Sequence, residues 1–481
     1  MRAVSLRVVA PTWKSVFFGS IVSLAAVSAQ AQTIFCPATI NTSNNGAATN
    51  FALAAGLCTN GNTGAVSAAA LSSQALGDIQ QSVTQQTTTA TLDAISARRK
   101  EETERCPEGF ERSNDPERTC RRIAVAQPAP SASPSRPSRS RPAQKPVLMP
   151  VKAPPVIAVD PGYRFGVWAH GFGDYERRTD SAATTLSGLG GVAIGPVVAG
   201  GVAQTMAVDL TQTSTTWGVI GGGDVTFRGL LAGNDGLIVG ILAGYVSTDI
   251  SLNGTTRPTA PITDATIGTG TSSGKIRVSG PSVGGYYTYF NGPFSTDTTL
   301  KADFLSISES FTEVLAFNAG FGTGLVTGAG SANVTNFVAA SNYQYRFPMS
   351  AAVWVEPTVG YRYTNSNYDS GAAALGLQDG YDWRVQGGAR LGIESFWNSV
   401  HVTTTITGLA YSDVKIVGGP ITSGSFAGTI LPSDQGKVRG EGIFLANFDY
   451  GRGFSTFVQA EVRGGSGLLG AGGRVGARLD F

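Results

Sequence analysis

The chain alternates between apolar and polar side chains with a period of two from residue 160 to its last residue. The final segment shows this most clearly: one face carries Leu469, Ala471, Gly473, Val475, Ala477, Leu479 and Phe481, and the other carries Arg474, Arg478 and Asp480. Successive side chains of a β-strand point to opposite faces, so the pattern predicts strands with one apolar and one charged face. Because chain ends fray unless something holds them, we expect the C terminus to be built into a sheet.

Segments of this kind, counted between turn residues, predict twelve strands. They lie near 163–178, 214–229, 237–254, 274–291, 294–313, 331–347, 350–368, 380–398, 400–418, 437–450, 454–465 and 467–481. Short connections, such as 233–236 and 451–453, alternate with long ones at 179–213 and 254–273. An even strand count with short turns at one rim and long loops at the other predicts an all-β fold, a transmembrane antiparallel twelve-stranded β-barrel.

A soluble β-sandwich is the alternative, because it also alternates along its strands. Against it, charged residues make up only 14% of the chain, glycine contributes 63 residues, and many glycines and alanines lie on the apolar face. The polar face carries both charge signs, which can pair across a narrow wet lumen. We predict as lumen charges Arg384, Arg390, Glu394, Glu461, Arg463, Arg474 and Arg478, on the same face as Asp224, Arg228, Lys301, Asp303, Arg346, Glu356 and Arg362. Aromatic residues near strand ends predict interfacial girdles: Tyr286, Tyr287, Tyr289, Phe290, Tyr343, Tyr345, Phe347, Tyr361, Tyr363 and Tyr381.

The first 31 residues predict a secretory signal peptide. Positive charges precede a short apolar stretch at 16–27, and the small residues at 29–31 predict cleavage after Ala31. A membrane anchor is the alternative, but a spanning helix needs about 18 apolar residues and this stretch is shorter. We therefore expect the chain to be exported.

Four cysteines, Cys36, Cys58, Cys106 and Cys120, lie in the N-terminal part of the exported region. An even number of cysteines in an exported chain predicts disulfides. The simplest of the three possible connectivities joins Cys36 to Cys58 and Cys106 to Cys120. We expect no metal site, because the two histidines, His170 and His401, lie far from the cysteines in the sequence.

Composition divides the exported chain into an N-terminal region at 32–126, a Pro- and Arg-rich linker at 127–159 and the barrel at 160–481. Recurring prolines predict a semi-extended linker. Within the N-terminal region, residues 64–104 predict a small helical or partly disordered element, weakened by the threonines at 87–89. An oligomerising stalk is the alternative.

The sequence lacks the patterns that carry common enzyme chemistry. Neither G-x-S-x-G nor H-E-x-x-H occurs, and the glycine-rich stretches at 188–195 and 470–476 do not join a strand to a helix. The formal net charge of +2 indicates no nucleic-acid partner. We predict a protein that is not an enzyme and that has no cofactor.

The order of signal peptide, exported region, linker and C-terminal barrel resembles the autotransporters of type V secretion. The stretch "FGVWAHGFGDYERR" at 165–178 is similar to the aromatic–glycine pattern that opens their translocator domains, and the likeness covers about the last 320 residues. It implies a monomeric barrel in the outer membrane of a Gram-negative bacterium, whose partners are membrane lipid, periplasmic chaperones and the barrel-assembly machinery. It also implies that Phe481 serves as the assembly signal.

The chain departs from the family in two ways. Its N-terminal region is short and shows no strand repeat, and a proline-rich segment stands where the family threads a helix through the barrel. Residues 64–104 are a candidate substitute plug. The leading hypothesis is an anchor and translocator that displays a short N-terminal region at the cell surface, with no surface ligand indicated. The alternatives are a porin-like channel with a periplasmic N-terminal region and an outer-membrane barrel enzyme.

Overall fold

The computed structural model describes fifteen parts of the chain. They are residues 83–84, 86–92, 95–96, 110–112, 120–122, 163–189, 192–194, 197–199, 202–230, 235–258, 267–317, 323–372, 377–398, 400–418 and 435–481. The predicted signal peptide, the linker, Cys36, Cys58 and Cys106 lie outside these residues. Cys120 begins the strand β2 (Cys120–Arg122), which pairs with β1 (Phe110–Arg112).

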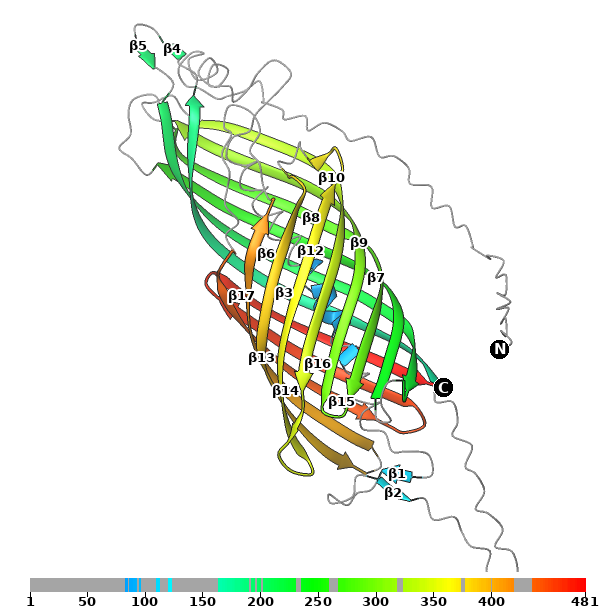
Figure 1. Cartoon of the computed structure of the whole chain (residues 1–481). Coiled ribbons are helices and arrows are strands. Elements are labelled where there is room, and N and C mark those ends of the chain that lie inside the picture. The colour runs from blue at the N-terminus through cyan, green and yellow to red at the C-terminus, as the bar shows by residue number, and fades with distance from the viewer. Residues whose placement is uncertain are drawn as a thin grey trace, which may run out of the picture.

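Twelve long antiparallel strands form one closed barrel, which confirms the predicted fold class and strand number (Figure 1). They are β3 (Tyr163–Leu189), β6 (Val202–Arg228), β7 (Asp235–Pro258), β8 (Ile267–Asn291), β9 (Phe294–Phe317), β10 (Thr323–Tyr345), β12 (Val353–Tyr368), β13 (Gly380–Trp397), β14 (Val400–Val417), β15 (Val438–Asp449), β16 (Phe454–Gly465) and β17 (Leu468–Asp480). Neighbours in sequence are neighbours in the barrel, and β3 pairs with β17 to close it. The short β11 (Phe347–Pro348) pairs with β12, and β4 (Val192–Ile194) pairs with β5 (Val197–Ala199).

The C-terminal residue is held in the sheet, as the alternation predicts. The backbone N–H of Phe481 donates to the carbonyl of Phe165 at 2.9 Å, and that of Asp480 donates to the carbonyl of Gly453 at 2.8 Å. The ring of Phe481 points outward and is 70% exposed. We call the β3–β17 pairing the seam, because it joins the first and last strands of the barrel.

The strands extend further than predicted at the rim that carries the long connections. The sequence predicted a loop at 179–213, but β3 continues to Leu189 and β6 begins at Val202. Likewise, β7 ends at Pro258 and β8 begins at Ile267. These extensions are rich in Thr, Ser and Ala, which weakens the alternation that marks the other strands. Antiparallel backbone pairing continues through them, as between Ala183 of β3 and Ala207 of β6.

The two faces of each strand differ sharply in exposure. On β17, Leu469 and Val475 are 64% and 61% exposed, whereas Arg474 and Arg478 are buried. An apolar outside and a charged inside reverse the arrangement of a soluble domain. They match the lipid-facing and lumen-facing sides of a membrane barrel.

Two of the aromatic residues predicted for the girdles point inward instead. Tyr286 and Phe290 are each 4% exposed, whereas Tyr287 between them is 43% exposed. Each inward ring lies over a glycine of β7: a Cβ at Gly240 would overlap the ring of Tyr286, and one at Gly236 would overlap Phe290. The girdle prediction was wrong for these two residues, because proximity to a strand end does not decide which face a side chain takes.

Candidate functional site in the barrel interior

A short helix from the N-terminal region lies inside the barrel (Figure 1). The structure describes it at residues 83–84, 86–92 and 95–96, which we call the lumen helix. All of these residues except Thr89 are buried. Val83 and Ile95 belong to the same buried apolar cluster as Leu305 and Ile307 of β9. The described part of the predicted helix at 64–104 is therefore helical, and the barrel wall surrounds it.

Hydrogen bonds tie the lumen helix to four different strands. Gln86 Nε2 of the helix donates to Asp174 Oδ1 of β3 at 2.7 Å. In the other three bonds the wall donates and a helix hydroxyl accepts. These bonds run from Asn336 Nδ2 of β10 to Thr84 Oγ1 at 2.9 Å, from Arg390 Nη1 of β13 to Ser96 Oγ at 2.9 Å, and from Lys301 Nζ of β9 to Thr87 Oγ1. These strands lie on different sides of the barrel. The helix is therefore fixed from several directions rather than resting on one wall.

Three threonines of the lumen helix, Thr87, Thr88 and Thr91, donate their hydroxyls to carbonyls of the helix itself. Thr88 Oγ1 donates to the Thr84 carbonyl at 2.6 Å, and Thr91 Oγ1 donates to the Thr87 carbonyl at 2.8 Å. Such bonds to carbonyls one turn earlier are available to Thr in a helix. Tertiary contacts supply the rest of the stability, because a short helix with β-branched residues is marginal alone.

The wall away from the seam is lined with buried ion pairs. Two cations bind both oxygens of their partner: Arg384 donates to Asp413 at 2.6 and 2.7 Å, and Lys301 donates to Asp303 at 2.7 and 2.8 Å. Two further arginines donate to one oxygen each: Arg362 to Asp382 at 3.0 Å, and Arg390 to Glu356 at 3.0 Å. Each pair joins neighbouring strands or neighbouring positions on one strand. Buried charges are tolerated when they are paired and hydrogen-bonded in this way.

One ion pair reaches across the last strand at the seam. In the β16–β17–β3 register, Gly472 lies between Glu461 and Asp174. Because Gly472 has no side chain on the inner face, Arg463 Nη2 of β16 passes over β17 and donates to both Asp174 oxygens of β3 at 2.6 Å. A Cβ at Gly472 would lie 2.6 Å from Asp174 Oδ2. Glycine at this position therefore leaves the space that the pair occupies.

A second ion pair reaches across the first strand near the rim with short turns. Arg478 Nη2 of β17 donates to Asp224 Oδ1 of β6 at 2.8 Å, passing over Gly166 of β3, where a Cβ would overlap the guanidinium. Tyr286 Oη donates to the other Asp224 oxygen at 2.8 Å and accepts from Trp168 Nε1 at 2.7 Å. Two ion pairs therefore cross the seam region, and each joins two strands that are not neighbours by passing over a glycine of the strand between them.

The seven charges predicted for the lumen occupy three parts of the interior. Arg463 and Arg478 form the two seam pairs, and Arg474 donates to Glu461 at 2.6 Å beside the first of them. Arg384 and Arg390 belong to the opposite wall. Glu394 is half-buried near the rim with short turns, 3.8 Å from His401.

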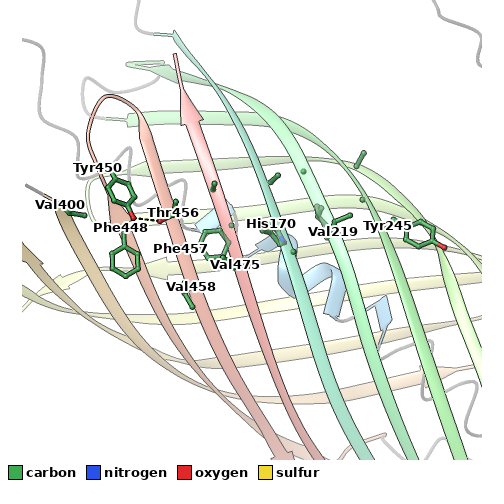
Figure 2. Close-up of a pocket in the computed structure, with 18 of the residues that line it drawn as sticks. His170, Val219, Tyr245, Val400, Phe448, Tyr450, Thr456, Phe457, Val458 and Val475 are labelled. Atoms are coloured by element: carbon green, nitrogen blue, oxygen red, sulfur yellow. Dashed lines mark hydrogen bonds between the residues drawn. The ribbon is translucent and has the colours of Figure 1, made fainter. Parts of the chain in front are cut away.

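The outer wall over the seam carries an apolar hollow of about 1120 Å³ (Figure 2). Its floor is made of small residues: Ala169, Gly171, Gly221, Ala243, Gly244, Gly476 and Ala477. Outward side chains such as Val219, Val458 and Val475 surround it. His170 borders the hollow, but its ring is buried against Trp168 and Phe457, with ring centroids 5.5 and 6.0 Å away. The hollow thus presents an apolar surface that suits hydrocarbon.

The described residues lack two further features. No helix among them is long and apolar enough to cross a membrane. They also contain no group of three or more His, Cys, Asp or Glu side chains arranged to hold a metal ion.

Comparison with known proteins gives the family. The model of the autotransporter beta-domain matches residues 198–461, more than half of the chain. The chain belongs to the autotransporter beta-domain family. Membership implies a barrel in the outer membrane of a Gram-negative bacterium. No curated protein matches the sequence.

Several solved autotransporter barrels resemble this autotransporter in fold. The beta domain of Bordetella BrkA is 16% identical, with 66% of this chain and 98% of that chain covered and a TM-score of 0.39. The transport unit of AIDA-I from Escherichia coli is 12% identical, with 66% and 90% covered and a TM-score of 0.39. The translocator domain of NalP from Neisseria meningitidis is 13% identical, with 66% and 88% covered and a TM-score of 0.32.

Sequence reasoning missed several acidic partners in the interior of this autotransporter. Asp174, Asp382 and Asp413 all pair with predicted arginines, yet they were not among the predicted lumen charges. Asp174 shares a strand face with the aromatic Trp168 and Phe172, which hides its polar character. A prediction that assigned every second residue of 165–178 to the lumen face, whatever its type, would have included Asp174.

Proposed function

We propose that this autotransporter anchors itself in the outer membrane through its barrel, translocates a short N-terminal segment, and keeps its pore closed with the lumen helix. The observation that carries the proposal is the burial of the helix among hydrogen-bond partners from β3, β9, β10 and β13. A segment fixed in this way fills the space that an open channel would need for solutes.

The rim at which the first strand begins and the last strand ends supports one orientation of the chain in the membrane. β3 begins, and β17 ends, at the rim that carries the short turns such as Asn291–Phe294 and Asp449–Phe454. Short turns face the periplasm in outer-membrane barrels. We therefore propose that the chain enters β3 from the periplasmic side and that the residues before 83 are the ones displayed at the cell surface. This limits the displayed part of the predicted region at 32–126 to about residues 32–82.

The ion pairs of the interior and the hollow on the outer wall support a role in the membrane. The arginines of the seam and of the opposite wall donate to carboxylates, and the hollow over the seam suits lipid chains. We therefore propose that the protein is not an enzyme and acts with membrane lipid, periplasmic chaperones and the barrel-assembly machinery, the last recognising Phe481. The predicted cysteine pairs staple the N-terminal region in this proposal.

Epitope tags at two positions test the orientation. One tag is inserted after residue 45, before the lumen helix, and a matched tag is inserted after residue 130, in the linker. Protease added to intact cells should remove the first tag and spare the second until the outer membrane is permeabilised. If both tags are protected in intact cells, the N-terminal region is periplasmic and the porin-like alternative gains support. If both are cleaved, the orientation of the connecting segment is wrong.

A further inference from the structure

One carboxylate joins the seam to the lumen helix. Asp174 of β3 accepts hydrogen bonds from Arg463 of β16 at 2.6 Å and from Gln86 of the lumen helix at 2.7 Å. Both donors reach Oδ1, and Arg463 also reaches Oδ2. The side chain is 8% exposed, so water does little to replace either donor.

The surroundings of Asp174 make its two donors interdependent. Two other buried carboxylates, Glu176 and Glu461, lie within 3.5 Å of the Arg463 guanidinium and share its charge. If Arg463 were lost, three carboxylates would lie close together with less positive charge. Asp174 would then lose its charged donor, and repulsion from the other two carboxylates would disfavour the position in which it meets Gln86.

Arg463 itself makes no hydrogen bond to the lumen helix among the described residues. Its contacts are Asp174, Glu176 and Glu461, which all belong to the barrel wall. Of these three carboxylates, Asp174 accepts a hydrogen bond from Gln86 of the helix, so we expect an effect of Arg463 on the helix to pass through Asp174. A side chain that only stabilised the barrel would have no such effect.

We propose that Asp174 is a positioning residue that couples retention of the lumen helix to closure of the seam. The intact Arg463–Asp174 pair holds the carboxylate where Gln86 can bind it. Opening of the seam withdraws that acceptor and favours release of the helix. By reciprocity, a docked helix stabilises the closed seam. The proposal rests on the proposed function in one respect, namely that the lumen helix closes the pore.

Single-channel recording on the full-length protein in planar bilayers tests the coupling. Arg463→Gln should raise the fraction of time the pore is open about tenfold, a value within the usual range of coupling between sites. Arg463→Lys should restore part of the closure, because it returns the charge. The matched control is Arg478→Gln, which breaks the other seam pair and leaves the Arg463–Asp174 pair in place. It should lower the temperature at which the barrel loses its compact gel migration, but it should raise the open fraction much less than Arg463→Gln does.

A helix-side variant keeps the test informative if Arg463→Gln does not fold. Gln86→Ala changes no barrel residue, and it should both open the pore and lower the temperature of the gel-migration change. A normal open fraction in Arg463→Gln, or an unchanged transition temperature in Gln86→Ala, would overturn the coupling. Deletion of residues 83–96 shows whether a negative result contradicts only the coupling or also the proposed closure of the pore by the helix. If the deletion leaves conductance unchanged, the helix does not close the pore and both proposals fall. If the deletion opens the pore but Arg463→Gln does not, only the coupling falls.

Discussion

Replacing Gly472 by alanine tests whether the seam depends on the absence of a side chain at this position. Gly472 lies on β17 between Asp174 of β3 and Glu461 of β16. An added Cβ would lie 2.6 Å from Asp174 Oδ2 and 3.2 Å from Glu461 Cγ. The first distance is well below van der Waals contact, so the Asp174 carboxylate must move away from the added Cβ, and we expect this shift to weaken its hydrogen bonds to Arg463.

The size of the effect follows from the burial of the pair. Arg463 and Asp174 are 3% and 8% exposed, so neither charge can turn to water. Removing one partner of a buried ion pair costs about 3–5 kcal/mol, because the other charge is left without compensation. Because the carboxylate can retreat without losing every contact, we expect the lower end, about 3 kcal/mol. This corresponds to a shift of roughly 150-fold in the unfolding equilibrium.

The measurement is urea-induced unfolding of the refolded barrel in detergent, followed by tryptophan fluorescence and by the change in gel migration. Gly473→Ala is the matched control, because the neighbouring residue faces outward and its added Cβ would lie 3.6 Å from the nearest atom, the Gln459 carbonyl oxygen. Gly472→Ala should unfold at a clearly lower urea concentration than Gly473→Ala. Equal midpoints would refute the argument that the glycine makes room for the pair.

Four further outcomes are expected. Phe481→Ala should lower outer-membrane levels in cells while still refolding in detergent, because the backbone N–H that bonds Phe165 is kept; normal cellular levels would contradict its role as an assembly signal. Peptide mapping under non-reducing conditions should join Cys106 to Cys120, and free thiols there would count against the pairing. The unboiled barrel should migrate as a single-chain species, whereas a boiling-sensitive trimer would disprove a monomer. Deleting residues 83–96 should raise conductance in planar bilayers, since their side chains fill the lumen.

Local pattern alone was enough to predict the barrel wall. The period of two is a property of each strand by itself, so Val475 could be placed on the outside and Arg474 on the inside without knowledge of any neighbour. Turn residues between the alternating segments separated the strands, and the count of twelve followed. The alternation up to Phe481 also predicted that the chain end is held in the sheet.

Tertiary structure decided which of these side chains meet. The pairing of Arg463 with Asp174 depends on the register of three strands and on an empty position at Gly472, and no stretch of sequence contains that information. The place of the lumen helix was equally hidden. A helix buried in a soluble core shows an apolar stripe. This one packs Val83 and Ile95 into an apolar cluster but also meets charges and amides, so its polar residues Gln86 and Thr84 bind the wall as well. The sequence by itself therefore determined the wall, because strand faces follow from local backbone geometry. Only the closed barrel determined the seam pairs and the place of the lumen helix, because they arise from contacts between residues as far apart as 294 positions.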